Sequence, residues 1–326
     1  MQVLIVTTRS TPTERVEQHL RALGHVPVRL ETDRFPAELR LSLLPEGHIQ
    51  LRDGETRVVL DSLEAIWYRR ALYRHDLPPE ADLNLRRGVV EEVRSFIQGL
   101  MASQDAFLLQ PKWSIDHTDA KPRQLSLARA CGLDVPATLA GNEAEAARAF
   151  GRENGDQIVT KLFTGFAVAQ EGAQKVMFTT ALGPEEIAEI DGLDLCPAAF
   201  QERLEKVKEY RVTLVGDEVF ACSVDSAQAV EGEVDWRRAQ GELAASWRRD
   251  TLPEDAARGL KRLCHRLELS YGAADFILTP EGRCVFLEVN PAGEYLWMDQ
   301  VWEGAISEAL AEVLVGLRPR RPADGP

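Results

Sequence analysis

Residues 271–290, YGAADFILTPEGRCVFLEVN, consist of two apolar runs joined by a short turn, and they carry three side chains that end in oxygen. The turn TPEG predicts a β-hairpin. Because side chains alternate between the two faces of a strand, Glu288 and Asn290 share one face, and the hairpin brings Asp275 across from them. Two carboxylates and a carboxamide are hard ligands suited to Mg²⁺. Spacing alone leaves a second interpretation open, in which all three are solvated residues on an exposed hairpin.

A pair of lysines lies upstream of this hairpin. Only seven of the 38 basic residues are lysine, so a lysine at the end of an apolar strand stands out. Lys161 follows Ile158 and Val159 and precedes a short loop that could close over phosphates, with the ammonium group as a point charge. Lys121 lies 40 residues earlier. Either lysine, taken alone, is also compatible with an ordinary surface position.

An extended segment between the lysines and the hairpin is the third feature. It ends at Gln201, Glu202, Arg203 and Leu204. Free backbone groups at the end of such a segment can hydrogen-bond the edge of an adenine, and Glu209 is near enough in sequence to reach ribose hydroxyls. The same pattern also fits a simple strand edge with alternating charges.

The chain changes character at about residue 119. Residues 1–118 alternate short apolar strands with amphipathic helices, and a DG dipeptide at 53–54 signals a hairpin, so this part is predicted to be an α/β domain. Beyond it, helices accompany antiparallel hairpins at 212–224 and 272–289, which predicts an α+β arrangement.

Length, composition and charge exclude several classes of protein. The chain has 326 residues and a hydrophobic fraction of 44%, as in a globular protein of about two domains. With 38 basic against 52 acidic residues the net charge is −14, which argues against a nucleic-acid binder that needs a basic face. The sequence has neither an apolar run of membrane-spanning length nor the basic start of a signal peptide, so we expect no membrane partner and a cytoplasmic protein.

Taken together, the three features resemble those of ATP-grasp ligases in order and approximate spacing. The surrounding segments narrow the resemblance to the microviridin-type maturases, which are graspetide macrocyclases that crosslink side chains of ribosomally made precursor peptides. The similarity covers the chain from about residue 1 to residue 312. The segments that carry it are VLIVTT near the N-terminus, ETDRFP at 31–36, IWYRR at 66–70, FQERLEKVKEYRVTLVGDEVFA from Phe200, Asp225-Ser226, Asp235-Trp236-Arg237, and LEVNPAGEYLWMD from Leu287.

The resemblance implies an ATP-grasp fold in which a pre-ATP-grasp α/β domain, 1–118, precedes a central subdomain, 119–200, and a C-terminal subdomain, 201–326. It also implies ATP and Mg²⁺ as cofactors. The site residues that it implies are Lys121 and Lys161 on the phosphates, Gln201, Glu202, Arg203 and Leu204 around the adenine, Glu209 on the ribose, Asp275, Glu288 and Asn290 on two Mg²⁺ ions, and Arg211 and Arg237 on the acylphosphate and the oxyanion of its collapse.

One position departs from the related D-alanine ligases. Those enzymes carry an arginine two residues before the metal-binding aspartate, whereas this chain has Ala273 there. Arg211 is the candidate to supply that charge instead.

The activity that the resemblance implies is ATP-dependent macrocyclisation. A peptide Asp or Glu carboxylate is activated as an acylphosphate and joined to a Thr or Ser hydroxyl as an ω-ester. Two alternatives stay open within the superfamily: a maturase that forms amides with Lys, and a ligase that adds glutamate. A nucleotide-binding regulatory module without turnover is the alternative from another class.

The implied partner is a precursor peptide with a leader and a core rich in Thr, Glu and Asp, and the enzyme is implied to be a homodimer. Leader recognition is expected around 184–199 and the hairpin 212–224, where apolar anchors alternate with acidic residues in the first segment; a solvated amphipathic surface explains that pattern equally well. Arg69 and Arg70 could hold the acidic core or pair with carboxylates between domains.

Overall fold

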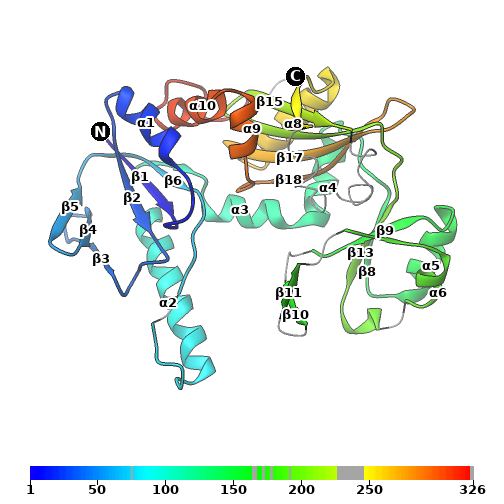
Figure 1. Cartoon of the computed structure of the whole chain (residues 1–326), viewed down its shortest axis with the longest axis horizontal. Coiled ribbons are helices and arrows are strands. Elements are labelled where there is room, and N and C mark those ends of the chain that lie inside the picture. The colour runs from blue at the N-terminus through cyan, green and yellow to red at the C-terminus, as the bar shows by residue number, and fades with distance from the viewer. Residues whose placement is uncertain are drawn as a thin grey trace.

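The computed structural model describes residues 1–74, 76–163, 167–170, 173–176, 179–190, 192–225 and 246–323. Figure 1 shows three groups of elements: an N-terminal group in blue and cyan, a small sheet in green, and a larger sheet in green to orange with the C-terminal helices beside it. Helix α3 (Lys112–Asp119) leads from the first group toward the other two. In the described part of the chain, no helix is long and apolar enough to cross a membrane.

The N-terminal group is built on a parallel sheet in the order β2-β1-β6-β7. Alternation along β1 sends Val3 and Ile5 into one core and Leu4 and Val6 into another, so the sheet is covered on both faces, as parallel strands require. Its elements are β1 (Gln2–Thr7), α1 (Glu14–Ala22), β2 (Val26–Glu31), β6 (Leu63–Tyr68), α2 (Leu83–Ala102) and β7 (Phe107–Leu109).

A three-stranded antiparallel sheet is inserted between β2 and β6. It consists of β3 (Leu39–Leu43), β4 (Ile49–Asp53) and β5 (Thr56–Leu60). The β4–β5 hairpin turns at Gly54, whose φ of 57° suits glycine, and the predicted hairpin is therefore confirmed. Strand β3 was not indicated by the sequence pattern.

The small sheet has the order β12-β9-β13-β8 and packs against two helices. A separate antiparallel pair, β10 (Ala167–Gln170) and β11 (Ala173–Val176), follows β9 in the chain. The remaining elements of this group are β8 (Thr138–Gly141), α5 (Ala144–Glu153), β9 (Ile158–Lys161), β12 (Thr180–Leu182), α6 (Pro184–Ala188), the 3₁₀ turn η1 (Leu193–Leu195) and β13 (Ala198–Glu202).

The larger sheet is antiparallel, with the order β16-β15-β14-β17-β18. One face packs on α4 and α8, and the other face contributes to a core that also includes α10. The elements are α4 (Lys121–Ala130), β14 (Lys208–Val215), β15 (Glu218–Val224), β16 (Arg248–Asp250), α8 (Glu254–Arg266), β17 (Tyr271–Leu278), β18 (Cys284–Asn290), α9 (Leu296–Val301) and α10 (Ala305–Leu314).

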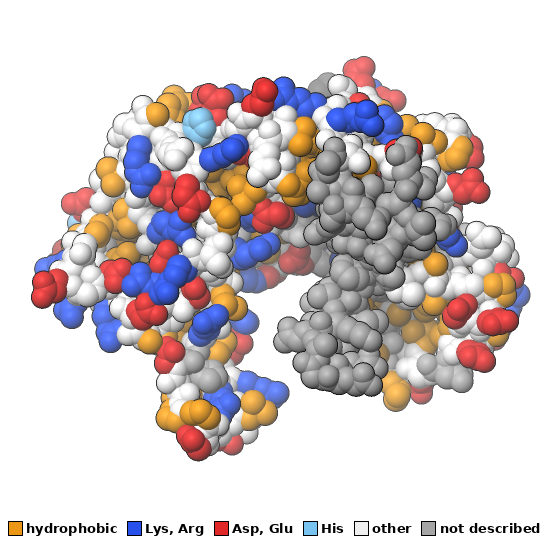
Figure 2. Space-filling model, viewed as in Figure 1, with side chains coloured by type: hydrophobic (Ala, Val, Ile, Leu, Met, Phe, Trp, Pro, Cys, Tyr) orange, Lys and Arg blue, Asp and Glu red, His pale blue; other side chains and the backbone are white. Residues whose placement is uncertain are grey.

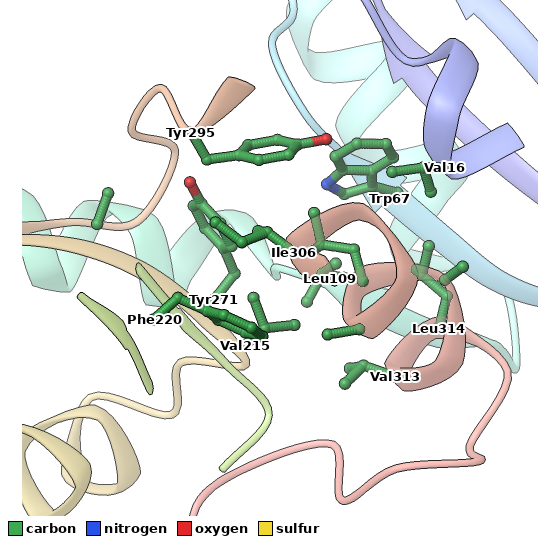
Figure 3. Packing of buried hydrophobic residues seen from close by; sticks show 14 of the residues in the cluster. Val16, Trp67, Leu109, Val215, Phe220, Tyr271, Tyr295, Ile306, Val313 and Leu314 are labelled. Atoms are coloured by element: carbon green, nitrogen blue, oxygen red, sulfur yellow. The ribbon is translucent and has the colours of Figure 1, made fainter. Parts of the chain in front are cut away.

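Helix α10 joins the N-terminal group to the larger sheet. In Figure 3, Val16 of α1 and Trp67 of β6 lie beside side chains of α10 such as Ile306, and Val215 of β14 lies on the opposite side of that helix. All four belong to one buried cluster. The two ends of the chain therefore share a core, and their relative placement is stabilised by apolar burial.

The predicted α/β and α+β organisation is confirmed. Two facts bear on the predicted internal limits: β13 runs across residue 200, and Ala128 of α4 packs in the same core as α8 and the larger sheet. The subdomain limits 119–200 and 201–326 stay a prediction. Helices α9 and α10 were not indicated by the sequence pattern.

Candidate active site

Three charged side chains form a row across adjacent strands of the larger sheet. Arg211 of β14 pairs in register with Asp275 of β17, which in turn pairs with Glu288 of β18. The Arg211 Nη1 donates to Asp275 Oδ1 at 3.1 Å, and the two residues are only 7% and 6% exposed. This is the polar continuation of the face whose apolar residues pack on α10, so the row is held by a rigid, buried sheet.

Lys121 meets the row from helix α4. Its Nζ lies 3.1 Å from Glu288 Oε2. The placement of α4 follows from Gln124, a buried residue one turn further on, whose carboxamide accepts from the Val289 N–H and donates to the Val289 carbonyl, both at 2.9 Å. Gln124 could not be predicted from the sequence, because a polar residue on a helix carries no local signal that it will bond the edge of a distant strand.

A pocket opens beside Lys121, between the small sheet and the larger one. Lys161, at the end of β9, lines it together with Gln201 of β13 and Glu288. The structure thus brings the two predicted phosphate-binding lysines to one cavity. Its lining residues are Lys121, Pro122, Gln124, Leu125, Ser126, Arg129, Thr138, Ala140, Lys161, Phe163, Ala199, Gln201, Leu287 and Glu288.

Of the four residues predicted to surround the adenine, only Gln201 lines the pocket. Gln201 is buried, donates to Thr138 Oγ1 at 3.1 Å and lines the pocket. The N–H groups of Glu202 and Arg203 bond the carbonyls of Ala137 and Gln157. These two donors are therefore engaged within the protein, which corrects the prediction of free backbone groups at this position. Leu204 is half-buried just beyond them.

Glu209, the predicted ribose ligand, is buried at the start of β14. Lys206 Nζ lies 2.7 Å from its Oε1, and the side chains of both are 7% exposed. A buried carboxylate is costly without a partner, and Lys206 supplies that partner. Lys206 was not among the predicted site residues, although its i, i+3 spacing from Glu209 is a local signal for such a pair.

Asn290 stands at the exposed end of β18, two residues after Glu288. Its Oδ1 accepts from the Ala292 N–H at 2.9 Å, which starts a turn. Among the described residues no group of three or more His, Cys, Asp or Glu side chains is arranged to hold a metal ion. The predicted set has two carboxylates and one carboxamide, and its hard oxygen donors on paired strands fit Mg²⁺.

The residues after Asn290, Pro291-Ala292-Gly293-Glu294, connect this row to the N-terminal group; we call them the PAGE segment. Arg69, directly after β6, is 3% exposed and places Nη2 3.0 Å from Glu294 Oε2. Burial by itself raises the pKa of Glu294, but Arg69, backbone N–H groups and Arg70 together lower it below its ordinary value. The expectation that Arg69 pairs with a carboxylate between domains is confirmed. Arg70 is half-exposed, 3.9 Å from the same carboxylate.

The leader surface predicted around 184–199 is only partly exposed. Ile187 and Leu193 belong to the core of the small sheet, whereas Leu195 is 86% exposed and Glu185 and Glu189 are exposed. In the hairpin of β14 and β15, which was also expected to take part, Val212–Val215 and Phe220–Val224 are buried, and the turn around Asp217 is what reaches the surface. The hairpin contributes buried side chains to two hydrophobic cores, so most of its apolar residues are not exposed to a leader peptide. Arg237 lies outside the described residues.

Comparison with known proteins agrees with this geometry. The family model of the MvdD pre-ATP grasp domain matches residues 2–116. A Chryseobacterium gregarium RiPP-associated ATP-grasp ligase, solved with ADP and a leader and core peptide, is 31% identical over 100% of this chain and 99% of its own, with a TM-score of 0.93. Macrocyclase MdnC from Microcystis aeruginosa MRC, bound with precursor peptide MdnA, is 35% identical over 97% and 100%, with a TM-score of 0.86. Macrocyclase MdnB from the same organism is 30% identical over 97% and 99%, with a TM-score of 0.79. No curated sequence gave a match.

The fold and these neighbours define an ATP-grasp ligase, and the prediction that the chain is an enzyme of this class is confirmed. Since three relatives are at least 30% identical over nearly their whole length, the chain belongs to the microviridin and graspetide maturase family of ATP-grasp ligases. The predicted pre-ATP-grasp domain at its N-terminus is part of that family's fold.

Proposed function

We propose that this enzyme is an ATP-dependent macrocyclase that joins Asp or Glu side chains of a ribosomally made precursor peptide to Thr or Ser hydroxyls as ω-esters. The observation that carries the proposal is the row Arg211, Asp275 and Glu288, which Lys121 connects to the pocket. Lys121 and Glu288 line the pocket side by side. A cation there suits the binding of a phosphoryl group that is being transferred, and a carboxylate suits the Mg²⁺ that would accompany it.

Within this proposal the pocket holds ATP. Lys121, Lys161 and Gln201 line this pocket. The two lysines contact the phosphates as point charges, and Gln201, followed in the chain by Glu202, Arg203 and Leu204, borders the adenine. Glu209 faces the ribose. The relatives support the nucleotide, because the Chryseobacterium gregarium enzyme was solved with ADP.

Asp275, Glu288 and Asn290 are the residues that would hold Mg²⁺. When bound, the metal neutralises charge on the phosphoryl group that is being transferred. In this structure Arg211 and Lys121 are the cations next to the two carboxylates. The same two side chains are then placed to contact anionic substrate groups beside the metal site.

The chemistry proceeds in two steps. A carboxylate oxygen of the peptide attacks the γ-phosphorus of ATP, the bond to the bridging oxygen breaks, and ADP leaves. A hydroxyl oxygen of the same peptide then attacks the acyl carbon, its proton is lost, and inorganic phosphate leaves with the former carboxylate oxygen. Arg211 stabilises the acylphosphate and the oxyanion of the second step, and Arg237 is proposed for the same role.

The peptide is proposed to be held a second time through its leader. Glu185, Glu189 and Leu195 are exposed in the segment 184–199, and two acidic side chains with one apolar side chain suit a basic, aromatic leader. Reversing the charge of both glutamates to lysine should weaken leader binding, whereas Glu46→Lys, an exposed acid on the N-terminal group, should not. Unchanged leader affinity in the double variant contradicts this part of the proposal.

Intact-mass analysis tests the function. The enzyme, ATP and Mg²⁺ are incubated with the small Thr- and Glu- or Asp-rich peptide encoded beside the enzyme's gene, and we expect the loss of one water per link. Asp275→Asn should abolish the reaction, and Glu303→Gln, an exposed carboxylate paired with Arg249, should leave it intact.

The other outcomes separate the alternatives. A gain in peptide mass indicates a ligase that adds glutamate. An unchanged peptide mass, with a rate of ADP release that does not rise when the peptide is added, indicates a nucleotide-binding module without coupled turnover. Mild alkali opens esters and spares amides, so links that survive it indicate a Lys-joining maturase. The homodimer, the cytoplasmic location and the three-part division of the chain are included in this proposal on the family resemblance and the sequence.

A further inference from the structure

The PAGE segment is bonded by side chains along its whole length. Each of its four backbone carbonyls accepts a hydrogen bond from a side chain of a distant element. The donors are Gln110 to Pro291 at 2.7 Å, Arg69 to Ala292 at 3.2 Å, Tyr271 to Gly293 at 2.7 Å with Arg69 at 3.5 Å, and Arg211 to Glu294 at 3.2 Å. These contacts favour a single conformation of the segment, because releasing any of the four carbonyls costs a hydrogen bond.

Two of the four donors come from the N-terminal sheet. Arg69 directly follows β6 and Gln110 directly follows β7, and these strands are parallel neighbours. The carboxyl ends of neighbouring parallel strands lie at the same edge of a sheet, so both donors reach the segment together. Arg69 also binds the Glu294 carboxylate at 3.0 Å, and its guanidinium therefore contacts three successive residues.

The PAGE segment also contacts Arg211. Its Nη2 donates to the Glu294 carbonyl, while its Nη1 donates to Asp275. Gly293 approaches so closely that a Cβ there would lie 2.8 Å from Arg211 Nη2. The guanidinium is thus oriented by two partners, the Asp275 carboxylate and the carbonyl of Glu294. Burial raises the pKa of Tyr271 to about 12, so its hydroxyl stays a donor to the segment at neutral pH.

We propose that Arg69 of the N-terminal domain is a positioning residue for the transfer reaction, and that it acts by holding the PAGE segment against Arg211. The inference rests on the proposed function of Arg211. It gives the pre-ATP-grasp domain a part in the reaction, because Arg69 of that domain would fix the orientation of the Arg211 guanidinium in the larger sheet. A guanidinium misplaced by about 1 Å lowers a rate by about 100-fold.

The test is steady-state kinetics of the full chain with Arg69→Met and Arg69→Lys, using ATP, Mg²⁺ and the gene-neighbour peptide. We expect kcat to fall about 10- to 100-fold in Arg69→Met, with the KM for ATP unchanged, because Arg69 does not line the nucleotide pocket. Arg69→Lys keeps the charge and one contact to the segment, and it should recover part of kcat. Val16→Ala, which loosens the shared core without touching the segment, is the control for mere destabilisation.

A second measurement does not need the peptide. Thermal unfolding of the single and double variants Arg69→Met and Arg211→Met should show non-additive shifts, since both act on one segment. The inference is overturned if Arg69→Met has the kcat of the wild-type enzyme, or if Val16→Ala loses as much kcat as Arg69→Met. It is also overturned if the Tm shifts of the two single variants add up to that of the double variant. If the wild-type enzyme leaves the peptide unchanged while the shifts remain non-additive, the proposed function fails and the positioning of Arg211 by Arg69 stands.

Discussion

Replacing Gly293 by alanine is expected to disturb both the stability of the protein and the position of Arg211. An ideal Cβ at residue 293 would lie 2.5 Å from the Ala273 Cβ, 2.8 Å from Arg211 Nη2 and 3.3 Å from the Asn290 Cβ. Non-bonded carbons ordinarily approach to about 3.5–4.0 Å. The new methyl group therefore overlaps Ala273 by about 1 Å or more.

This overlap is hard to relieve. Ala273 is fully buried in β17, a strand hydrogen-bonded on both sides, so its Cβ cannot retreat. The PAGE segment or the Arg211 guanidinium must move instead. Overpacking of this kind costs about 1–3 kcal/mol. At about 2–4 °C per kcal/mol for domains of roughly this size, Tm should fall by about 2–12 °C, and kcat should fall with it.

Three variants make the test specific. Gly99→Ala places its methyl group on the exposed side of α2 with nothing within 4 Å, and it should hold or raise Tm. Ala273→Gly removes the methyl group with which the new Cβ of Gly293→Ala overlaps. The double variant should therefore lose less stability than the sum of the losses in the two single variants. Differential scanning calorimetry and the cyclisation assay measure both effects. A Gly293→Ala enzyme with wild-type Tm and turnover refutes the argument.

Three further predictions follow from single side chains. Lys121→Met should weaken ADP binding about 10- to 100-fold, the loss of one hydrogen bond to a charged group, and calorimetric titration would contradict this by an unchanged Kd. Burial alone raises the pKa of Asp250, but hydrogen bonds from Ser223 and Lys208 lower it overall; this carboxylate then stabilises the fold above its unfolded pKa of about 3.9 and loses that effect as the pH falls through its folded value. Asp250→Asn should therefore lower Tm at neutral pH, with a difference that shrinks below about pH 4, and a gap that does not depend on pH contradicts the assignment. Cys196 is the exposed thiol, and the four other cysteines are buried or half-buried, so mass spectrometry after brief alkylation of the native protein should find Cys196 labelled first.

On the face shown in Figure 2, basic and acidic side chains are intermixed, although acidic residues outnumber basic ones 52 to 38 in the whole chain. Two cations beside the site lie in the protein's interior, since Arg69 is 3% and Arg211 7% exposed, whereas the Lys121 side chain at the pocket is 34% exposed. An acidic protein can in this way offer a positive site to anionic substrates, because short-range pairing in a buried site outweighs the screened charge of the surface.

Part of the site was predictable because it is local in sequence. Asp275 and Glu288 face each other across one hairpin, and the turn between their strands sets the pairing register. Lys161 could be placed for a similar reason, since an apolar run that ends in a lysine predicts a strand with the charge at its end. The alternation in 184–199 predicted more apolar side chains at the surface than the structure has, because Ile187 and Leu193 satisfy it by entering the core of the small sheet.

The amino-acid sequence by itself determined the hairpins, the N-terminal α/β pattern, the family and the identity of the charged residues, since these depend on periodicity, turn chemistry and short spacings. The tertiary structure alone decided what those residues touch. Arg211 meets Asp275 from 64 positions away, Gln124 positions α4 on β18, and Arg69 reaches the PAGE segment across 225 positions. Such contacts depend on which strands become neighbours and on how buried surfaces of distant segments fit, and no local pattern in a chain encodes that fit.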